Sequence, residues 1–392
     1  MPAVEVRENN VRRYPINPRP GWEKIVSSQG LNYHSVEGRP YWDESAYWEF
    51  TSSEVDRLEA ATAELQKMCL AAGDYILRRN HLAAMHISEA AIPAIRGTWK
   101  DEPPALYGRM DLAYDGYAIK LLEYNADTPT SLIEAAVIQW YWLQDRFPTR
   151  DQWNSLHERL VAKWRDLVLY VQQPVHFAHD GDEEDLLTIS YLRDTAREAG
   201  IDSVALLMHE IGWDNDRHCF VGHGTTPLAT LFKLYPWETL LAEPFGMNAL
   251  VNMASGNKPQ KGRTQWIEPI WKMLWSNKAL LAILWEMYPD HEFLLPAYLD
   301  GPRDMTRYVR KPILGREGAN ISVVNGSHGF ETDGRFADGP WVYQGLAPVR
   351  YVDGNYAVLG SWLIDGEPAG LGMRESHDPV IRNTDRFVPH LF

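Results

Sequence analysis

A stretch of alternating polar and apolar residues, Gly108 to Asp127, constrains the fold of this chain more than any other segment. It reads Gly-Arg-Met-Asp-Leu-Ala-Tyr-Asp-Gly-Tyr-Ala-Ile-Lys-Leu-Leu-Glu-Tyr-Asn-Ala-Asp, and the Asp115-Gly116 pair between two apolar runs predicts a β-hairpin. Because alternate residues of a strand point to one face, Glu123 and Asn125 emerge side by side. Two hard oxygen ligands at this spacing suit Mg²⁺. The segment therefore predicts a metal site on a sheet.

The length of the hairpin loop decides whether Asp111 joins this pair. A two-residue loop pairs Asp111 with Lys120 and turns its side chain to the opposite face. A three-residue loop of residues 114–116, with the glycine left-handed, pairs Asp111 with Ile119 and brings it to the face of the glutamate and the asparagine. We expect the three-residue loop, because only this register assembles the polar side chains on one face.

The expected Mg²⁺ ligands are Asp111, Glu123 and Asn125, and Arg109 beside them is placed to meet a polyphosphate through two hydrogen bonds. The alternative is a solvated hairpin with scattered surface charge, the more frequent state of any single carboxylate. The combination favours a site, because an asparagine among residues that favour burial needs hydrogen-bonding or metal partners to offset its desolvation.

The composition is that of a globular protein with an acidic surface. The 392 residues are 45% hydrophobic and 12% aromatic, enough for one large core or two to three fused lobes, and most of the 16 tryptophans are expected in cores or ligand clefts. A net charge of −15 argues against nucleic acid as a partner and requires a local basic pocket for any anionic substrate.

The cysteines and the apolar segments bear on the compartment. Cys69 and Cys219 make neither a disulfide framework nor a metal-binding pattern, and the N-terminal Met-Pro-Ala-Val-Glu-Val-Arg lacks the apolar core of a signal peptide. No apolar run approaches the roughly 20 residues that span a bilayer. We therefore expect a cytoplasmic protein that does not insert into a membrane, and its oligomeric state stays open.

Helical and strand-like patterns alternate along the chain. Residues 1–50, rich in Pro, Tyr and Trp, are expected as an extended segment along the body. Thr51-Ser-Ser-Glu54 has the form of a capping box and predicts a helix to about Asn80. Further helices are expected at 131–145, 151–169 and 268–287, and mostly strands at 308–392. An inserted α/β lobe is expected at about 180–240, with a strand at 185–190, a helix at 191–199 and a strand at 203–208.

A second cluster of candidate residues lies between Tyr308 and Val324, where a strand, a glycine loop and another strand follow one another. A loop with Gly315 and Gly318 can bring backbone N–H groups against phosphate oxygens, and Lys311 at the end of the first strand adds a positive charge. The common alternative is a plain hairpin.

Three further segments carry weaker signals for the same chemistry. Lys278 follows Ser276-Asn277 where a helix is expected to start, so that its ammonium and the helix amides could meet an anion; the alternative is a surface lysine. The strand ending at Gln344-Gly345-Leu346 could pair its backbone with an adenine edge or be an ordinary buried strand. Arg374, after a glycine-rich strand end, could clamp a transferred phosphate or form a salt bridge with Glu375 or a distant carboxylate.

Together these segments resemble the glutathionylspermidine synthase family, in its synthetase domain and stand-alone bacterial relatives, over nearly the whole chain. The matching motifs are Gly108-Arg109-Met-Asp111, Leu122-Glu123-Tyr-Asn125-Ala-Asp127, Trp275-Ser-Asn-Lys278, Arg310-Lys311-Pro with the glycine loop, Tyr343-Gln344-Gly, and Gly372-Met-Arg374-Glu-Ser376. The resemblance implies an α/β (α+β) fold of the permuted ATP-grasp type, one unit over residues 1–392 whose antiparallel sheets clasp ATP, with the clamping region at about 270–392. It also implies ATP- and Mg²⁺-dependent ligation of a carboxylate to an amine through an acyl phosphate.

Carried over residue by residue, the resemblance assigns roles in metal binding, ATP binding and catalysis. Asp111, Glu123 and Asn125 would hold Mg²⁺. ATP would be bound by Lys278, by Lys311, by the loop from Gly315 to Gly318, and by the strand of Gln344, Gly345 and Leu346. Arg109 and Arg374 would contact ATP as well and, as the catalytic residues, neutralise the transferred phosphoryl group.

The resemblance also implies contacts with the peptide and amine substrates. Hydroxyls after the Asn-Ala-Asp motif, at Thr128, Thr130 and Ser131, and two acids of the inserted lobe, Glu183 and Glu184, would make them. The acidic run around these glutamates, 180–185, is usually a solvated loop, but it could receive a polyamine. Bifunctional members carry an N-terminal amidase domain; none is expected in this chain, and neither glutathione nor spermidine is singled out as a substrate.

Two other functions stay open at this point. A glycoside hydrolase would use paired carboxylates and abundant tryptophan, but it gives no role to Asn125, Lys278, Lys311 and the glycine loop. A catalytically silent nucleotide- or ligand-binding protein is excluded by no motif. Mg²⁺-dependent phosphate release from ATP separates the ligase from both.

Overall fold

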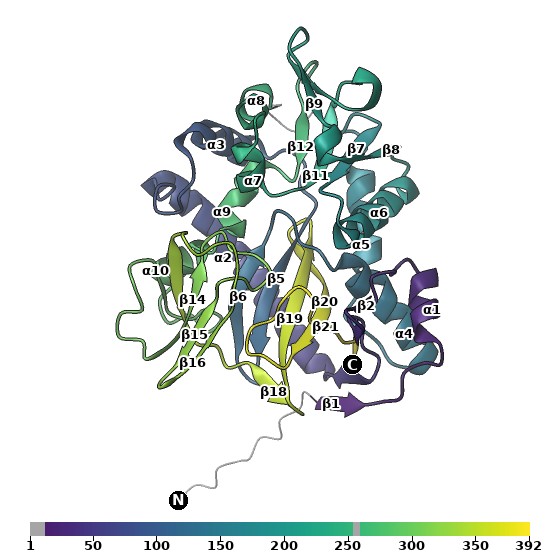
Figure 1. The fold of residues 1–392 in the computed structure, drawn as a ribbon, viewed down its shortest axis with the longest axis vertical. Helices are drawn as coiled ribbons and strands as arrows, with labels where there is room; N and C mark the ends of the chain where they lie inside the picture. Colours follow the sequence, from purple (N-terminus) through teal and green to yellow (C-terminus); the bar gives the residue numbers. More distant parts are fainter. Residues whose placement is uncertain (1–11, 254–258) are drawn as a thin grey trace, which may run out of the picture.

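The computed structural model describes residues 12–253 and 259–392, which form a mixed α+β fold with antiparallel sheets at one end and a parallel sheet at the other (Figure 1). The largest sheet is antiparallel, with the order β21-β20-β19-β5-β6 and with β18 paired to β19. Its strands are β5 (Tyr107–Tyr114), β6 (Ile119–Asn125), β18 (Arg350–Val352), β19 (Asn355–Ile364), β20 (Glu367–Ser376) and β21 (Arg386–Phe387). This mixed α+β class agrees with the coarse fold expected from the sequence.

A second antiparallel sheet has the order β13-β17-β14-β15-β16. Its strands are β13 (Ala297–Tyr298), β14 (Arg307–Pro312), β15 (Ser322–Asn325), β16 (His328–Glu331) and β17 (Trp341–Gly345). The chain that leads into this sheet lies against β6, where Leu121 N donates to Phe293 O at 2.9 Å and Lys120 Nζ donates to Glu292 O at 2.8 Å. The strand-rich C-terminal part of the chain is therefore as predicted.

The third sheet is parallel, with the order β12-β11-β7-β8. Its strands are β7 (Val175–His179), β8 (Ser203–Leu207), β11 (Thr230–Leu234) and β12 (Gln265–Ile267), accompanied by α5 (Leu156–Leu167), α6 (Glu183–Glu198), α7 (Trp237–Ala242), α8 (Gly246–Asn252) and the hairpin of β9 (Gly212–Asp214) and β10 (Cys219–Val221). The predicted strand at 203–208 is confirmed, but the predicted strand at 185–190 is wrong. Asp182 caps a helix there by accepting from Asp185 N, and three acidic residues occupy the first turn, where the helix dipole favours them.

The N-terminal region is folded onto the body rather than extended throughout. A small sheet joins β1 (Arg12–Pro15), β4 (Ala46–Glu49) and the C-terminal β22 (His390–Leu391), and β2 (Ser35–Val36) pairs with β3 (Arg39–Pro40). The helix α1 (Trp22–Ser28) lies between β1 and β2 in the chain, and the expectation of an extended segment did not include it. Residues 1–11 of that expectation lie outside the described residues.

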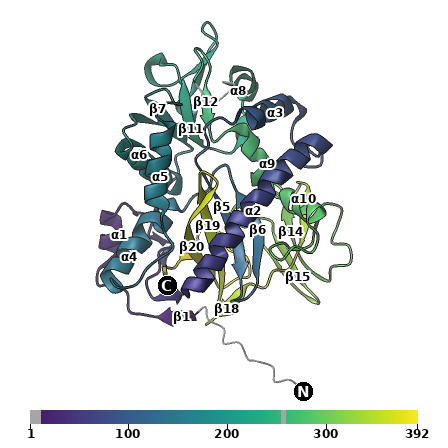
Figure 2. The same cartoon turned by 180° about the vertical axis from the view of Figure 1, so that it is seen from behind.

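The longest helix, α2 (Ser52–Arg79), crosses the back of the largest sheet (Figure 2). The predicted capping box is confirmed, because Thr51 Oγ1 accepts from Glu54 N while the Glu54 carboxylate accepts from Thr51 N. The remaining helices are α3 (Ile92–Asp101), α4 (Gln139–Arg146), α9 (Met273–Ser276) and α10 (Leu280–Met287), with single turns or short helices η1 (Glu89–Ala91), η2 (Glu134–Ile138), η3 (Met208–Glu210), η4 (His223–Thr225) and η5 (Ile270–Lys272). The continuous helix expected at 268–287 is therefore three short pieces.

The hairpin of β5 and β6 has a different register from the predicted one. Asp111 and Glu123 nevertheless lie on the same face of the sheet, as predicted. Its loop has four residues, 115–118, so Tyr114 pairs with Ile119, and the three-residue loop is wrong. A bulge then shifts the register between Asp111 and Leu112, so that Asp111 lies directly opposite Glu123. An extra residue in one strand reverses the parity of the pairing, which is why the predicted shared face is confirmed although the loop length is not.

Nine of the 16 tryptophans are buried, among them Trp42, Trp48, Trp237 and Trp362. This agrees with the expectation that most of them fill cores. In the part of the chain that the structure describes, no helix is both long enough and apolar enough to cross a membrane.

Candidate active site

A cavity of about 660 Å³ opens between the largest sheet, the glycine loop and the parallel-sheet region. One wall carries Arg109, Asp111 and Glu123 of the hairpin, and another carries Glu184 and Asp185 at the start of α6. Other residues that line it include Thr128, Thr130, Ser131, Glu238, Arg316, Gly318, Gly360, Arg374 and Asn383. Much of the predicted site, drawn from segments as far apart in the chain as Arg109 and Arg374, therefore faces one cavity.

The hairpin presents a compact group of charges to this cavity. Arg109 holds Asp111 through two hydrogen bonds, from Nε at 2.7 Å and from NH2 at 3.2 Å. Asn125 lies between the carboxylates, with Nδ2 at 3.2 Å from Asp111 Oδ2 and 3.1 Å from Glu123 Oε1. Its amide oxygen reaches the same position when the side chain rotates by half a turn.

Two lysines complete the group from other parts of the chain. Lys278 Nζ lies 2.9 Å from Glu123 Oε2 and donates to Gly315 O at 2.6 Å, which joins the hairpin to the glycine loop. Lys278 stands between α9 and α10 and is buried, so the surface-lysine alternative is wrong. Lys311 Nζ donates to Leu122 O at 3.0 Å and to Gln344 Oε1 at 2.8 Å.

Burial and charge set the protonation of this group. Burial alone would raise the pKa of Glu123, but the charges of Lys278 and Lys311, with hydrogen bonds from Lys278 and Asn125, lower that pKa to about 2. Burial raises the pKa of Asp111, and the Arg109 charge opposes that rise. Burial lowers the pKa of Lys311 to about 8, against the attraction of Glu123. Glu123 is thus ionised at neutral pH.

The donor set fits Mg²⁺ bound with a polyphosphate. Within residues 12–253 and 259–392, no three His, Cys, Asp or Glu side chains form a metal-type cluster, so the candidate set consists of two carboxylates and one amide. Mg²⁺ commonly takes one or two carboxylates and completes its shell with water and phosphate oxygens. Arg109, Lys278 and Lys311 supply the positive charge that the phosphates would need.

The glycine loop, residues 313–321, folds back over the cavity and is held at both ends. Gly318 has a φ of +71°, and a Cβ there would lie 2.7 Å from Ile381 O, so only glycine fits. Arg316 between the two glycines reaches across the cavity, donating to Glu238 Oε1 at 2.6 Å and to Thr128 Oγ1 at 2.9 Å. The Gly315 N–H already has an acceptor, Pro312 O at the end of β14.

The strand predicted to meet adenine is less open than expected. Gly345 N donates to Pro296 O at 2.7 Å and Leu346 N donates to Arg307 O at 3.2 Å, so both N–H groups already have acceptors. The Gln344 side chain is buried and bridges Lys311 to Leu121 O. An adenine edge would therefore have to bind to backbone carbonyl oxygens of this strand. Binding to the two N–H groups would first require their present hydrogen bonds to break.

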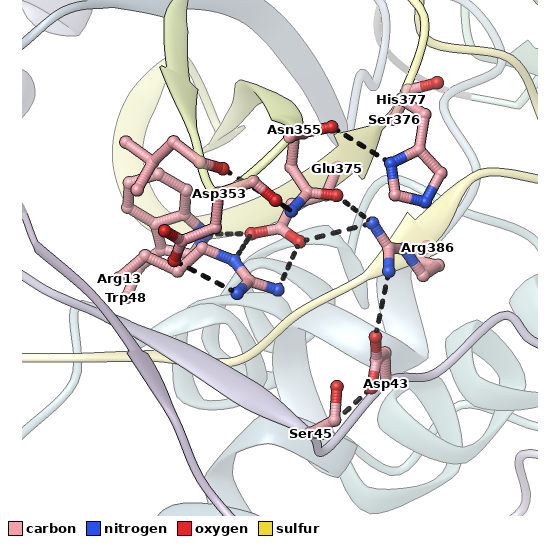
Figure 3. Close-up of polar contacts among 12 residues, drawn as sticks. Arg13, Asp43, Ser45, Trp48, Asp353, Asn355, Glu375, Ser376, His377 and Arg386 are labelled. Atoms are coloured by element: carbon pink, nitrogen blue, oxygen red, sulfur yellow. Dashed lines mark hydrogen bonds and ion pairs between the residues drawn. The ribbon is translucent and has the colours of Figure 1, made fainter.

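Arg374 on β20 faces the cavity, and its neighbour Glu375 points to the other side of the sheet. Figure 3 shows Glu375 held instead by Arg13, with Nε at 2.8 Å, and by Trp48 Nε1 at 2.6 Å, while Arg386 NH2 lies at 3.6 Å. The alternative salt bridge between Arg374 and Glu375 is therefore wrong. Arg374 donates to the carbonyl oxygens of the segment 382–385 and keeps Nε without a partner among the described residues.

The predicted substrate residues divide between the cavity and the surface. Ser131, at a φ of +65°, donates to Glu184 Oε1 at 3.3 Å, and Asn383 donates to Glu184 Oε2 at 2.7 Å. Thr130 contributes its carbonyl oxygen, which accepts from Arg109 NH1 at 2.8 Å. Glu183 is exposed and does not line the cavity, since consecutive residues of a helix point in different directions.

Arg316, Tyr41 and Glu134 are among the residues near the cavity that were not predicted from the sequence. Arg316 sits inside the glycine loop, and its charge was overlooked beside the glycines. Tyr41 and Glu134 are buried behind Ser131, where Tyr41 donates to Glu134 Oε1 at 2.9 Å. A buried glutamate in the apolar run Leu132-Ile-Glu-Ala-Ala-Val was the one signal available.

The cavity of this α+β fold is lined by charged side chains of both signs, which suits a small charged ligand. Residues 13–392 match the family model described as "Glutathionylspermidine synthase preATP-grasp". The chain belongs to this family of acid–amine ligases, which form an amide from a carboxylate and an amine.

The relatives include both stand-alone and longer proteins. A Haemophilus influenzae protein named "Putative acid–amine ligase" is 36% identical and aligns over 95% of this chain and 97% of its own length. The bifunctional glutathionylspermidine synthetase/amidase of Escherichia coli is 28% identical over 88% of this chain and 58% of its own. Trypanothione synthetase of Crithidia fasciculata is 28% identical over 75% of this chain and 48% of its own. The chain thus spans about half the length of the last two.

Proposed function

We propose that this chain is an ATP- and Mg²⁺-dependent ligase that activates a peptide-like carboxylate as an acyl phosphate and joins it to an amine or polyamine. The observation that carries the proposal is one connected group of side chains. Arg109, Asp111 and Glu123 line the cavity, Asn125 and Lys278 contact these carboxylates, and Lys311 contacts the backbone of Leu122 beside them. Two carboxylates and an amide suit Mg²⁺, and three cations suit the phosphates. Mg²⁺, when bound, would neutralise phosphate charge.

The proposal extends to the arrangement of the fold. We infer a permuted ATP-grasp unit, because the metal-type residues at 111–125 precede the lysines at 278 and 311 in the chain. Lys278 reaches the hairpin from between α9 and α10, and Lys311 reaches it from the second antiparallel sheet. In this arrangement residues 270–392 clamp ATP. The region of about 180–240 contributes substrate contacts through α6 and α7, whose residues line the opposite wall of the cavity.

The acidic wall favours a cationic acceptor. Asp180, Asp182, Glu184 and Asp185 line one end of the cavity. Burial, with the charges of Asp182 and Glu184, raises the pKa of Asp185 to about 8. A bound ammonium group would relieve the repulsion among these carboxylates, so an amine with more than one positive charge fits better than a neutral one. Ser131 contacts Glu184 of this wall, Thr130 O accepts from Arg109, and Thr128 accepts from Arg316. In this proposal the carboxylate substrate meets the phosphoryl group beside these residues.

The deciding experiment is a screen of carboxylate and amine pairs for ADP release above the background ATPase rate, with mass spectrometry of the products. We expect ADP release that requires both partners and Mg²⁺ and that yields a new amide. ADP release independent of the amine, or absence of Mg²⁺-ATP binding by calorimetry, would rule out the ligase. Sugar release from a glycoside without ATP would support the hydrolase instead.

The pKa of Lys311 predicts how nucleotide affinity depends on pH. With that pKa lowered to about 8, Lys311 is protonated at pH 7 and loses its charge as the pH rises through 8. Charge-assisted hydrogen bonds contribute about 1.5–3 kcal/mol, so we expect the affinity for ATP to fall about tenfold between pH 7 and pH 9. Calorimetric titrations at fixed Mg²⁺ measure this. Lys311→Met should bind weakly with no such slope, whereas Lys163→Met, a lysine away from the cavity, should keep the slope.

Gly360 predicts a catalytic effect without a change in charge. It pairs with Asp111 in the ladder of β19 and β5, and a Cβ there would lie 2.9 Å from Cδ of Arg109. Gly360→Ala is expected to displace the Arg109 guanidinium and lower turnover by about 10- to 100-fold. The matched control is Gly97→Ala in α3, where a Cβ meets no atom within 4 Å. Equal turnover in both variants would contradict the placement of Arg109 at the reacting group.

A further inference from the structure

A chain of hydrogen bonds leads from the acidic wall of the cavity into the protein interior. At the cavity, Ser131 Oγ donates to Glu184 Oε1 at 3.3 Å. Behind it, Tyr41 Oη lies 3.2 Å from Ser131 Oγ and donates to Glu134 Oε1 at 2.9 Å. Two carboxylates, one at the cavity and one buried, are thus connected through two hydroxyl groups.

The inner end of this chain is closed off from solvent. Tyr41 is completely buried and Glu134 is 1% exposed. Glu134 Oε2 has no hydrogen-bond partner among the described residues, which is costly for a buried carboxylate unless it carries or receives a proton. The charged groups that act on Glu134 are Glu184 of α6 and Arg374 of β20, whose guanidinium carbon lies 5.6 Å from the centre of the Tyr41 ring.

Amide formation from an ammonium group needs an acceptor for one proton. The acyl phosphate loses its C–O bond to phosphate, the C–N bond forms, and the nitrogen of the ammonium gives up two protons. Hydrogen phosphate leaves with one of them. The other must reach a base close to the amine.

We propose that Glu184, Ser131, Tyr41 and Glu134 form a proton relay that takes this second proton from the amine. The inference rests on the proposed ligase function. Glu184 at the cavity receives the proton, and Ser131 and Tyr41 each accept one proton and pass on another. Glu134 holds the proton inside the protein until the product has left. Glu134 and Tyr41 are thus positioning residues that keep Glu184 able to act again as a base.

The ionisation of Glu134 is suited to this task. Burial, reinforced by the charge of Glu184, raises the pKa of Glu134 to about 7. A group with a pKa near the working pH can both accept and return a proton. A buried carboxylate with a purely structural role would be more stable if both of its oxygens accepted hydrogen bonds, whereas Oε2 of Glu134 has no partner among the described residues.

The test compares two acceptors in the same variants. Hydroxylamine is largely uncharged at pH 8 and brings one proton fewer than an alkylammonium, so it captures the acyl phosphate without the relay. With the amine and carboxylate that the screen identifies, Glu134→Gln and Tyr41→Phe are each expected to lower the amine-dependent rate at pH 7 by about 100-fold. Hydroxamate formation and ATP affinity should stay at the parent level. The deficit should shrink towards pH 10, where the free amine is already deprotonated.

A matched control separates the relay from general packing. Tyr114 is another buried tyrosine that donates to a buried glutamate, Glu54, at 2.9 Å, and it lies outside the cavity. Tyr114→Phe should keep both rates. Equal losses with hydroxylamine and with the amine in Tyr41→Phe would overturn the relay and leave the ligase intact. Absence of hydroxamate from the parent protein would overturn both.

Discussion

Replacing Asp111 by asparagine is expected to lower acid- and amine-dependent ADP release by about 10²–10³-fold, the loss seen when one electrostatic contact to a transition state is removed. Asp111 lies opposite Glu123 and is held by Arg109. The substitution keeps the shape and removes the charge that would bind Mg²⁺. It also frees Arg109 from its partner, so ATP binding should weaken less than turnover. Steady-state kinetics over a range of Mg²⁺ concentrations would show a raised Mg²⁺ requirement.

The control for this variant is another carboxylate paired with an arginine. Asp300 binds Arg303 at 3.1 Å on the surface, away from the cavity. Asp300→Asn should leave both turnover and the Mg²⁺ requirement unchanged. If Asp111→Asn behaves in the same way, the hairpin is not the metal site.

The largest expected loss of stability comes from Lys233→Met. Lys233 and Asp127 form an ion pair at 2.6 Å with no exposure of either side chain, and Asp127 Oδ2 also accepts from Trp237 N at 2.9 Å. Removing the lysine leaves a buried carboxylate without its counter-charge, which costs about 3–5 kcal/mol. The free energy of unfolding, measured by urea denaturation, is expected to fall by that amount.

Two further variants give this prediction its contrast. Asp127→Asn added to Lys233→Met removes the stranded charge and should restore most of the loss. Lys163→Met breaks a pair with the exposed Asp365 and should cost less than about 1 kcal/mol. A loss for Lys233→Met no larger than that for Lys163→Met would contradict the assignment of a buried pair.

Local signals in the sequence predicted local structure well. The capping box at Thr51 and Glu54 acts within four residues, and the helix begins where it was predicted. The face of the hairpin was predicted because the alternation of side chains survives a wrong loop length when a bulge compensates. The strand expected at 185–190 failed because an apolar run fits either a strand or a helix, and the cap at Asp182 decides between them.

Contacts between segments far apart in the chain could not be predicted from the sequence pattern. Arg316 and Glu238 are 78 residues apart, and Tyr41 and Glu134 are 93 apart, so no spacing rule joins them. The family resemblance predicted that the hairpin, the lysines and Arg374 share one site, because a family motif assigns roles to residues that lie far apart in the sequence. Positions outside the motifs, such as Glu134, carried no such guidance.

The bulge at Leu122 has a mechanical consequence. The extra residue turns its carbonyl oxygen towards Lys311 Nζ, while the carbonyl of Leu121 accepts from Gln344 Nε2 at 2.8 Å. Both acceptors belong to the largest sheet and both donors to the second sheet. The hydrogen bonds at the bulge therefore join the two sheets. The sheets are then expected to move as one rigid block, and opening of the cavity for substrate exchange would be confined to the glycine loop and the helices facing it.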